Sequence, residues 1–260
     1  MRLAVGIEYD GTAYNGWQRQ KSGVGVQQRL EEAIAAVADH DLDVICAGRT
    51  DTGVHASGQV AHFDSTSQRS ARGWLLGANS NLADDIALTW VTAVPESFHA
   101  RFSATARSYR YRILNRLVRS ALHRHRAWWI HQPLDADRMH EAAQALVGEH
   151  DFSAFRAAGC QAKSASRNVR SVAVTREGDW ITLEITANAF LQHMVRNITG
   201  TLAAIGAGEA PVHWAADVLA GCDRTAAGIA APPQGLTLVS VEYPASLGLP
   251  APPEPVHFGP

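Results

Sequence analysis

The sequence feature that most constrains the fold is an alternation of strand-like and helix-like segments, which occurs twice along the chain. Between Leu3 and Tyr9 apolar residues alternate with smaller or polar ones, a pattern typical of a half-buried strand. Apolar residues then recur at helical spacing from Val26 to Val37, opposite a polar face, which indicates a helix lying on a sheet. The first half is completed by strands predicted at residues 43–47, 59–63 and 86–91 and by a short helix near Trp74.

The second half of the chain repeats this alternation. Its predicted elements are a strand at residues 107–114, a helix between Asp135 and Gly148, a hairpin around 177–179, a long helix at 191–205 and a strand at 236–241. Two such rounds predict an α+β fold of two β-α-β-β-α-β-like halves, of the ferredoxin or RNA-recognition-motif kind. We expect mainly antiparallel sheets, helices packed on one face, and an active-site cleft between the halves. The predicted domains are residues 1–100 and 101–244, followed by a proline-rich tail at 245–260 that is expected to be extended or disordered.

Composition excludes several classes of protein. Hydrophobic residues make up 46% of the 260 residues and charged residues 18%, which excludes an intrinsically disordered chain. The three cysteines, Cys46, Cys160 and Cys222, form no CxxC pair, so they predict neither a disulfide framework nor a zinc site. No apolar run reaches membrane-spanning length, and the acidic Glu8 comes too early for a signal peptide. We therefore expect a cytoplasmic protein with no membrane partner.

A polar loop between two predicted strands, residues 48–56, is the strongest candidate for chemistry. It carries a single carboxylate, Asp51, with Gly48 and Gly53 on either side and Arg49 two residues before it. Glycine adopts backbone angles closed to other residues, so such a loop can turn sharply and let a ligand approach its main chain. Loops held between strands often carry function, although clusters of Gly, Asp and Thr are more commonly plain turns.

A second candidate is a basic window without any acidic residue, between Ser97 and Leu134. The window contains eight arginines: Arg101, Arg107, Arg110, Arg112, Arg116, Arg119, Arg124 and Arg126. Because the whole chain has a net charge of −2, this concentration indicates a polyanionic partner, and interleaved aromatic residues favour RNA. The alternative is that arginine is simply the usual surface cation here, since the chain has only two lysines. Our candidate phosphate contacts are Arg101, Arg107, Arg110 and Arg112.

The string Gly48–Ala56 resembles the signature of the tRNA pseudouridine synthase A family, with Thr52 where that family is expected to have alanine. The resemblance extends from about residue 3 to residue 244 in the family's order. It is carried by further strings at residues 98–104, 107–111, 150–155, 190–198 and 235–238.

The resemblance implies an isomerase that converts uridine to pseudouridine at tRNA nucleotides 38–40, on the 3′ side of the anticodon stem-loop. Members of the family work as homodimers without a cofactor. Asp51 matches their catalytic aspartate and Arg196 the arginine paired with it. Tyr109 matches the tyrosine that stacks on the target base, and Leu236 the apolar residue near that base. We predict that Arg49, beside Asp51, also contacts the substrate.

The chemistry is compatible with one carboxylate. The uracil is cut at its C1′–N1 bond, turned over and rejoined through C5, so no atom is gained and neither a cofactor nor a metal is required. Asp51 can attack C1′, add to the base, or remove a proton from C2′, and the sequence leaves these three routes open. In each of them Asp51 must be ionised, and an adjacent Arg196 favours that form.

Each matched residue also has a purely structural interpretation. Tyr109 alternates with Tyr111 on one strand face, which is more typical of core packing than of ligand binding. Leu236 also fits the core. Arg196 lies opposite the apolar stripe of its predicted helix, so it faces either water or a cleft.

Three other functions compete with the isomerase. A glycosidase needs two carboxylates that flank the bond to be cut, and the loop offers only Asp51. A metal hydrolase could use His55, His62 and Asp64, but no metal-binding motif contains them. A non-catalytic RNA-binding module would explain the arginines and leave the Asp51 loop without a role.

Overall fold

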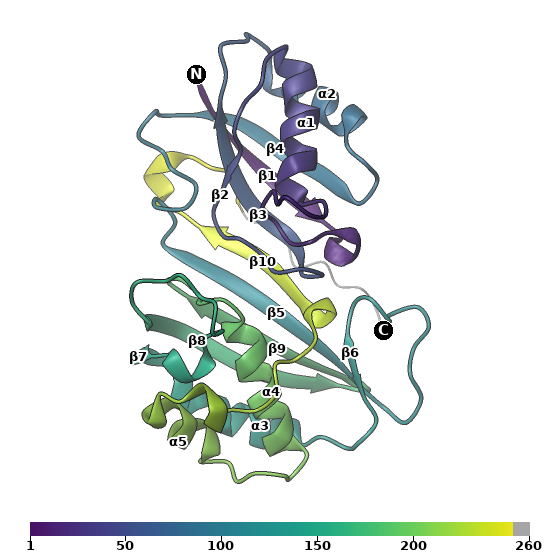
Figure 1. Ribbon diagram of the computed structural model, residues 1–260, viewed down its shortest axis with the longest axis vertical. Coiled ribbons are helices and arrows are strands. Elements are labelled where there is room, and N and C mark those ends of the chain that lie inside the picture. The colour runs from purple at the N-terminus through teal and green to yellow at the C-terminus, as the bar shows by residue number, and fades with distance from the viewer. Residues whose placement is uncertain (252–260) are drawn as a thin grey trace. The chain divides into compact units, whose positions relative to one another are not determined.

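The computed structural model describes residues 1–251, which form two compact units. Unit 1 contains Met1–Arg107 and the stretch that begins at Leu238, and unit 2 contains Ser108–Thr237 (Figure 1). Of the predicted proline-rich tail, Ala245–Leu247 forms one turn of 3-10 helix, and residues 252–260 lie outside the described residues. No helix in the described chain is both long and apolar enough to cross a membrane.

Unit 1 is built on an antiparallel sheet that carries two helices. Its elements are β1 (Arg2–Tyr9), α1 (Val26–Ala38), β2 (Ile45–Cys46), β3 (His55–Asp64), α2 (Ala71–Asn81) and β4 (Ile86–Val94). The strand order is β4-β1-β3, and β2 pairs with β3 as well. Helix α1 packs against α2, and α2 against β4 (Figure 1). The strand and helix pattern predicted for the first half is confirmed, although β2 is shorter than the predicted 43–47.

Strand β1 is buried on both faces rather than on one. Ala4 and Val5, neighbours that point to opposite sides of the sheet, are both fully buried. A Cβ atom built on Gly6 would lie 2.2 Å from the indole Nε1 of Trp90, so glycine lets this large ring lie against β1. In the sequence, the small residues of β1 suggested a side that faces solvent. In the structure they make room for the side chain of Trp90 on the neighbouring strand β4.

An acidic residue of α1 fixes the segment that leads into β2. Glu31 is 7% exposed, although helix periodicity placed it on the polar face. Its carboxylate accepts hydrogen bonds from Gln27 Nε2 at 2.8 Å and from Val44 N at 3.2 Å, and pairs with Arg19 at 2.9 Å. Buried carboxylates require such partners. Helix α1 thereby holds the chain that runs toward the Asp51 loop.

A buried histidine of β3 makes the stability of unit 1 depend on pH. His62 is 1% exposed, and its Nδ1 accepts a hydrogen bond from Ala100 N at 3.1 Å. Burial, with smaller effects from the charges of Arg2 and His99, lowers the pKa of His62 to about 4. An unfolded chain binds this proton near pH 6.5, so the stabilisation is present above about pH 6.5 and is lost as the pH falls toward 4.

We expect acidification from pH 7.5 to 4.5 to cost roughly 2–3 kcal/mol of unfolding free energy through His62 alone. The measurement compares urea unfolding of the wild type and of His62→Asn at both values of pH. The other titrating groups are shared, so their effects cancel in the comparison. The assignment is wrong if the two proteins lose the same stability on acidification.

Unit 2 contains further, largely antiparallel strands of the ten-stranded sheet and three helices. Its elements are β5 (Ala106–Asn115, beginning in unit 1), β6 (Trp128–Ile130), α3 (Ala136–Ala143), β7 (Gly148–Asp151), β8 (Ser166–Glu177), β9 (Trp180–Ala187), α4 (Met194–Gly206), α5 (Trp214–Gly221) and the start of β10 (Leu236–Glu242). The strand order is β5-β9-β8-β7, and the short β6 runs parallel to β5. The predicted hairpin is confirmed, with Gly178 at φ +57° between β8 and β9. Sequence patterns gave no sign of β6, β7 or α5.

Helix α4 is the central helix of unit 2 and packs against α3 and α5. Its predicted apolar stripe is present, and three polar residues on its other side are also buried, Asn197, Thr199 and Thr201. Thr199 Oγ1 donates to Val195 O at 2.8 Å and Thr201 Oγ1 to Asn197 O at 3.0 Å, which satisfies both hydroxyls within the helix. The helix is therefore enclosed on nearly all sides, and it presents Arg196 from its first turn.

Strand β10 is divided between the units. Leu236 and Thr237 belong to unit 2, whereas the strand from Leu238 onward lies beside β3 in unit 1. Thr105 N donates to Glu242 O at 2.8 Å, and the Tyr243 hydroxyl to Ala100 O at 2.7 Å, so the end of the chain completes unit 1. The sequence-based domain boundary at residues 100 and 101 falls before β5, whereas the compact units divide within β5.

Candidate active site

The Asp51 loop joins β2 to β3 in unit 1 and is fixed at both ends by β3. At its start, Ala47 N donates to Val60 O at 2.7 Å, and the buried Gln59 Nε2 donates to Gly48 O at 2.7 Å. Beyond Asp51 the loop closes in a turn, in which Val54 N donates to Asp51 O at 3.1 Å. Asp51 itself is half-buried. The loop therefore holds its carboxylate on a rigid backbone.

A second segment, residues 11–17, supports the loop from the side. Trp17 N donates to Thr50 O at 3.0 Å, and Gly53 N donates to Tyr14 O at 3.4 Å. Gly16 has φ +85°, and a Cβ atom there would lie 2.7 Å from Thr50 O. Glycine is therefore required at this close approach. Sequence analysis identified this segment only as a polar aromatic loop, because its partner lies more than thirty residues away in the chain.

Buried polar side chains complete the support of the loop. The hydroxyls of Tyr9 and Thr50 are 2.8 Å apart in a buried hydrogen bond. His55, 3% exposed, accepts a hydrogen bond from Gly11 N at Nδ1 with a length of 3.0 Å. Asp10 Oδ1 lies 3.1 Å from the same nitrogen. These contacts connect the end of β1 to both sides of Asp51.

The three residues considered for a metal hydrolase each have a separate protein partner. His55 binds Gly11, His62 binds Ala100, and Asp64 accepts two hydrogen bonds from Arg2, at 2.9 and 2.8 Å. Within the described chain, no group of three His, Cys, Asp or Glu side chains has the arrangement of a metal site.

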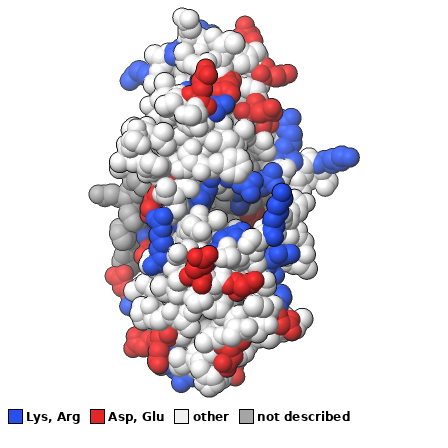
Figure 2. Space-filling model, turned by 90° about the vertical axis from the view of Figure 1, so that its left-hand side faces the viewer, with Lys and Arg blue, Asp and Glu red and all other residues white. Residues whose placement is uncertain are grey.

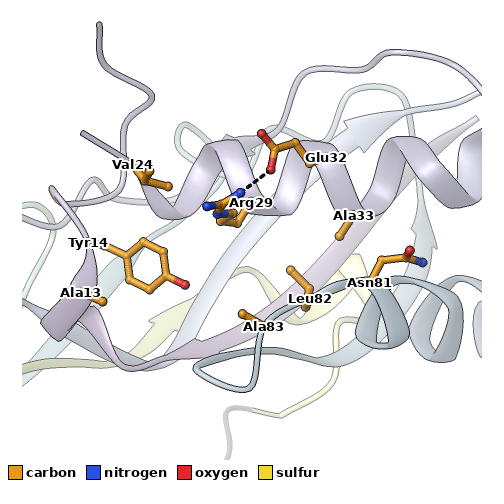
Figure 3. A pocket seen from close by; sticks show the side chains of 9 residues that line it. All are labelled: Ala13, Tyr14, Val24, Arg29, Glu32, Ala33, Asn81, Leu82 and Ala83. Atoms are coloured by element: carbon orange, nitrogen blue, oxygen red, sulfur yellow. Dashed lines mark hydrogen bonds and ion pairs between the residues drawn. The ribbon is translucent and has the colours of Figure 1, made fainter. Parts of the chain in front are cut away.

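A cavity of about 410 Å³ lies behind the supporting segment, between α1 and the chain that leads from α2 to β4 (Figure 3). Tyr14 forms one wall, and its hydroxyl donates to Asp85 Oδ1 at 2.5 Å. Arg29 pairs with Glu32 at 3.0 Å on the opposite wall. The single cation is thus balanced by carboxylates, and the cavity is not suited to a phosphate. Tyr14 links this wall to the Asp51 loop through its carbonyl oxygen.

Arg107, one of the candidate phosphate contacts, is 8% exposed and binds backbone carbonyl groups of unit 1. Its Nη2 donates to Ala47 O at 3.0 Å and to Arg101 O at 2.6 Å, and its Nη1 donates to Ala104 O at 3.3 Å. Ala47 is the residue just before the Asp51 loop. In unit 1 the guanidinium therefore ties the start of this loop to the chain that enters β5.

We expect Arg107→Met to lower the free energy of unfolding by about 2–3 kcal/mol, because methionine leaves the buried carbonyl oxygen of Ala47 and two partly buried carbonyl oxygens without this donor. Urea unfolding measures the change, and Arg72→Met, at an exposed position of α2, is the matched control that should have little effect. Equal stability of Arg107→Met and the control would contradict the role given to the guanidinium.

Unit 2 holds the other three predicted site residues. Tyr109 lies on β5, is 8% exposed, and packs edge-to-face on Phe190 with ring centroids 5.0 Å apart. Tyr111, two residues on, is fully buried; its hydroxyl donates to Pro232 O at 2.7 Å, and burial raises its pKa. Both tyrosines of this strand face are therefore buried and packed within unit 2.

Arg196 is held by the segment that leads into β10. Its Nε donates to Ala231 O at 2.7 Å, and Ala231 N donates back to Arg196 O at 3.0 Å. A Cβ atom on Gly235 would lie 2.7 Å from the ring of Tyr111, and Leu236, 5% exposed, follows directly. Residues 231–236 thus bind Arg196 at one end, lie against the ring of Tyr111, and end at Leu236. Helix periodicity predicted that Arg196 faces either water or a cleft. Its partner Ala231 lies in a segment for which the sequence predicted no element.

The remaining arginine candidates differ in their surroundings. Arg49 and Arg101 are exposed, and Arg101 lies 5.5 Å from the ring centroid of Phe102. Arg110 pairs with Glu184 at 2.6 Å. Arg112 stacks on Trp180 at 4.1 Å, and burial, with a smaller effect of Arg110, lowers its pKa. On the face drawn in Figure 2, exposed carboxylates occur as well as exposed cations, so the surface is not uniformly basic.

Comparisons with a family model and with individual known proteins point to the same family. A family model described as tRNA pseudouridine synthase matches residues 6–103 and 142–244, ranges that include Asp51, Arg196 and Leu236 but not Tyr109. A protein of Pseudoalteromonas atlantica named tRNA pseudouridine synthase A is 57% identical over 96% of this chain and 95% of its own length. Proteins with the same name are 56% identical in Aeromonas hydrophila, over 96% and 93% of the two chains, and 52% identical in Xanthomonas campestris, over 96% and 98%.

Proposed function

This chain belongs to the tRNA pseudouridine synthase family, and from that membership we propose that it isomerises uridine to pseudouridine at nucleotides 38–40 of the tRNA anticodon stem-loop, with Asp51 as the catalytic carboxylate. It is an isomerase that acts on tRNA. The observation that carries the assignment of the site is the Asp51 loop, which lies within the matched range and is fixed by hydrogen bonds from β3 and from residues 11–17. A carboxylate on a rigid loop is what a reaction with one acidic group requires.

In the proposed mechanism the target uridine leaves its helix, because its C1′ is out of reach while the base is stacked. Tyr109 and Leu236 contact the extruded base on its two faces. Asp51 attacks C1′, adds to the base, or removes the C2′ proton, and the glycosidic bond breaks. The freed uracil turns over and reattaches through C5, so a tight and largely dry pocket is needed to retain it.

In this proposal Arg196 and Arg49 supply positive charge to two negative groups, the Asp51 carboxylate and the RNA backbone. Arg196 pairs with the Asp51 carboxylate and places a positive charge beside it. Its hydrogen bond to Ala231 O leaves the other guanidinium nitrogens in a fixed orientation, which favours a directional contact. Arg49, exposed beside Asp51, contacts the RNA backbone.

The finer architecture is also a proposal. In chain order unit 1 supplies strand, helix, strand, strand, helix and strand, and unit 2 contains the same order with β6, β7 and α5 added, which supports two ferredoxin-like halves. We propose that the active-site cleft lies between them, that the domains are residues 1–100 and 101–244, and that the enzyme acts as a cytoplasmic homodimer. Arg101, Arg110 and Arg112 remain candidate contacts to RNA phosphates, and Arg107 a candidate beside its carbonyl partners.

The test of the function is incubation of the protein with an unmodified tRNA transcript, followed by mapping of pseudouridine at single-nucleotide resolution. We expect pseudouridine only at nucleotides 38–40, with no added metal or cofactor. Binding of the transcript without any modified uridine would favour the RNA-binding module. Release of free uracil would favour a glycosidase.

A further inference from the structure

The loop between β5 and β6 in unit 2, residues 116–126, has an unusual combination of charge and exposed apolar surface. We call it the basic arm. It contains four arginines and two histidines, and no acidic residue. Three large aliphatic side chains are also exposed on it: Leu117 at 80%, Val118 at 66% and Leu122 at 87%. Apolar side chains so fully exposed and so close together are typical of a binding surface.

The basic arm is anchored at its base by hydrogen bonds to the β8–β9 turn, to β6 and to the residues that follow β6. Asn115 N donates to Asp179 O at 2.7 Å, and its Nδ2 donates to Ile130 O at 3.0 Å and to Gln132 O at 2.7 Å. At the other end, Trp129 Nε1 donates to Arg116 O at 2.9 Å. Both ends are therefore fixed to the sheet of unit 2, and the arm projects from a rigid support.

Contacts within the arm, and one contact to β9, give it a defined shape. The ring of His123 packs edge-on against Trp180, with centroids 5.0 Å apart. Arg126 N donates to His123 O at 2.9 Å, which closes a turn, and Arg124 Nη1 donates to Ala121 O at 3.0 Å. A preformed arm loses little conformational entropy when it binds a partner.

Two arginines of the arm, Arg119 and Arg124, differ from the arginines of β5 in what they contact. Arg107 binds carbonyl groups, Arg110 pairs with Glu184, and Arg112 stacks on Trp180. Arg119 is exposed, and its side chain has no hydrogen bond or ion pair to any residue that the structure describes. Arg124 is also exposed, and its guanidinium donates to the neutral carbonyl of Ala121. Arg119 and Arg124 are thus available to an external anion, whereas Arg116 of the arm pairs with Asp179 at 3.7 Å.

We propose that the basic arm is a tRNA-binding element, in which Arg119 and Arg124 contact phosphates while Leu117, Val118 and Leu122 pack against bases or riboses exposed where the RNA stack is interrupted. Arginine supplies paired donors to phosphate, and proteins that kink or unstack nucleic acid use aliphatic wedges of this kind. The proposal rests on the proposed function, and it adds a contact outside the segments that the family model matches.

A second copy of this chain is the competing occupant of the arm. If the arm lay on a two-fold axis, it would meet the arm of the second copy, each with four arginines and no acidic residue. Like charges in such a contact oppose association. An RNA backbone instead supplies the negative charge that the arm lacks, so the observations favour RNA.

The experiment uses the full chain and an unmodified tRNA transcript. Dissociation constants are measured by filter binding over a range of salt concentrations for the wild type, Arg119→Ala/Arg124→Ala, Leu117→Ser/Leu122→Ser and the control Arg72→Ala. Pseudouridine formation by the wild type on the same transcript tests the proposed function separately. Circular dichroism and sedimentation show whether each variant is folded and whether its oligomeric state has changed.

We expect the double arginine variant to bind about 5- to 20-fold more weakly and to have a smaller dependence on salt, by up to about two phosphate contacts. The double leucine variant should bind about 3- to 10-fold more weakly with an unchanged salt dependence, because it removes no charge. Arg72→Ala should bind as the wild type does.

Wild-type affinity and salt dependence in both double variants would overturn the proposal, even if the wild type forms pseudouridine. A change of sedimentation in the leucine variant, with unchanged affinity per protomer, would assign the arm to contact between copies and would also overturn it. If the wild type binds the transcript but forms no pseudouridine, the proposed function fails, and the variants still decide whether the arm binds RNA.

Discussion

Replacing Asp51 with asparagine is expected to lower the rate of pseudouridine formation by a factor on the order of 10⁴ or more, with little change in tRNA affinity. Asparagine has nearly the same shape as aspartate but is neither a nucleophile nor a base. Asp51 accepts the turn-closing hydrogen bond of the loop through its backbone oxygen, and that contact is unaffected by the substitution. The loss should therefore lie in the chemical step, and single-turnover kinetics with saturating enzyme measure it directly.

The matched control for this variant is Asp84→Asn, which removes an exposed carboxylate of unit 1 and should leave the rate unchanged. Thermal unfolding of both variants should occur within a few degrees of the wild type, since exposed or half-buried polar substitutions have small effects. Retention of more than about a tenth of the wild-type rate by Asp51→Asn would show that another group does the chemistry. Loss of tRNA binding would instead assign Asp51 to the RNA interface.

Replacing Arg196 with lysine is expected to lower kcat by about 10²- to 10³-fold, with KM within a few-fold of the wild type. Lysine keeps the positive charge but has only one nitrogen. It cannot donate to Ala231 O, as the arginine Nε does at 2.7 Å, and also present a planar pair of donors to a carboxylate. Steady-state kinetics on the tRNA transcript separate the effects on kcat and KM.

Arg224→Lys is the control for structural damage, because Arg224 connects the same loop to the same helix. Its Nη1 donates to Gly228 O at 3.1 Å and its Nη2 to Asn197 Oδ1 at 3.0 Å. We expect this variant to unfold at a lower temperature and to keep a nearly normal kcat once folded. If Arg196→Lys and Arg224→Lys lose stability and kcat in the same proportion, Arg196 supports the fold and not the reaction.

Local sequence patterns were sufficient to predict the elements that surround the candidate site. The glycines around Asp51 predicted a loop between two strands, and β2 and β3 flank it as expected. The apolar stripe ending at residue 205 predicted α4, which carries Arg196. These predictions succeeded because strand alternation, helix periodicity and glycine placement are properties of neighbouring residues.

Contacts between distant segments were not predictable in the same way. The charge pattern marked Arg107 as a cation for RNA, but it does not show that the carbonyl oxygen of Ala47, sixty residues earlier, lies against it. Glu31 counted as a polar-face residue because its partners, Val44 and Arg19, are on other segments. Nor does sequence spacing show that Ala231 meets Arg196. Each of these depends on tertiary packing, which overrides local preference.

The division of the last strand has a consequence for the order in which the protein acquires its structure during synthesis. Unit 2 is one continuous stretch of chain, whereas unit 1 needs the strand beginning at Leu238 to lie beside β3. On the ribosome the first hundred residues emerge early, yet their sheet keeps an open edge at β3 until the strand that begins at Leu238 has been made. The Asp51 loop therefore lies next to an unpaired edge of β3 during synthesis. This edge is covered only after the residues of α4 have already been synthesised.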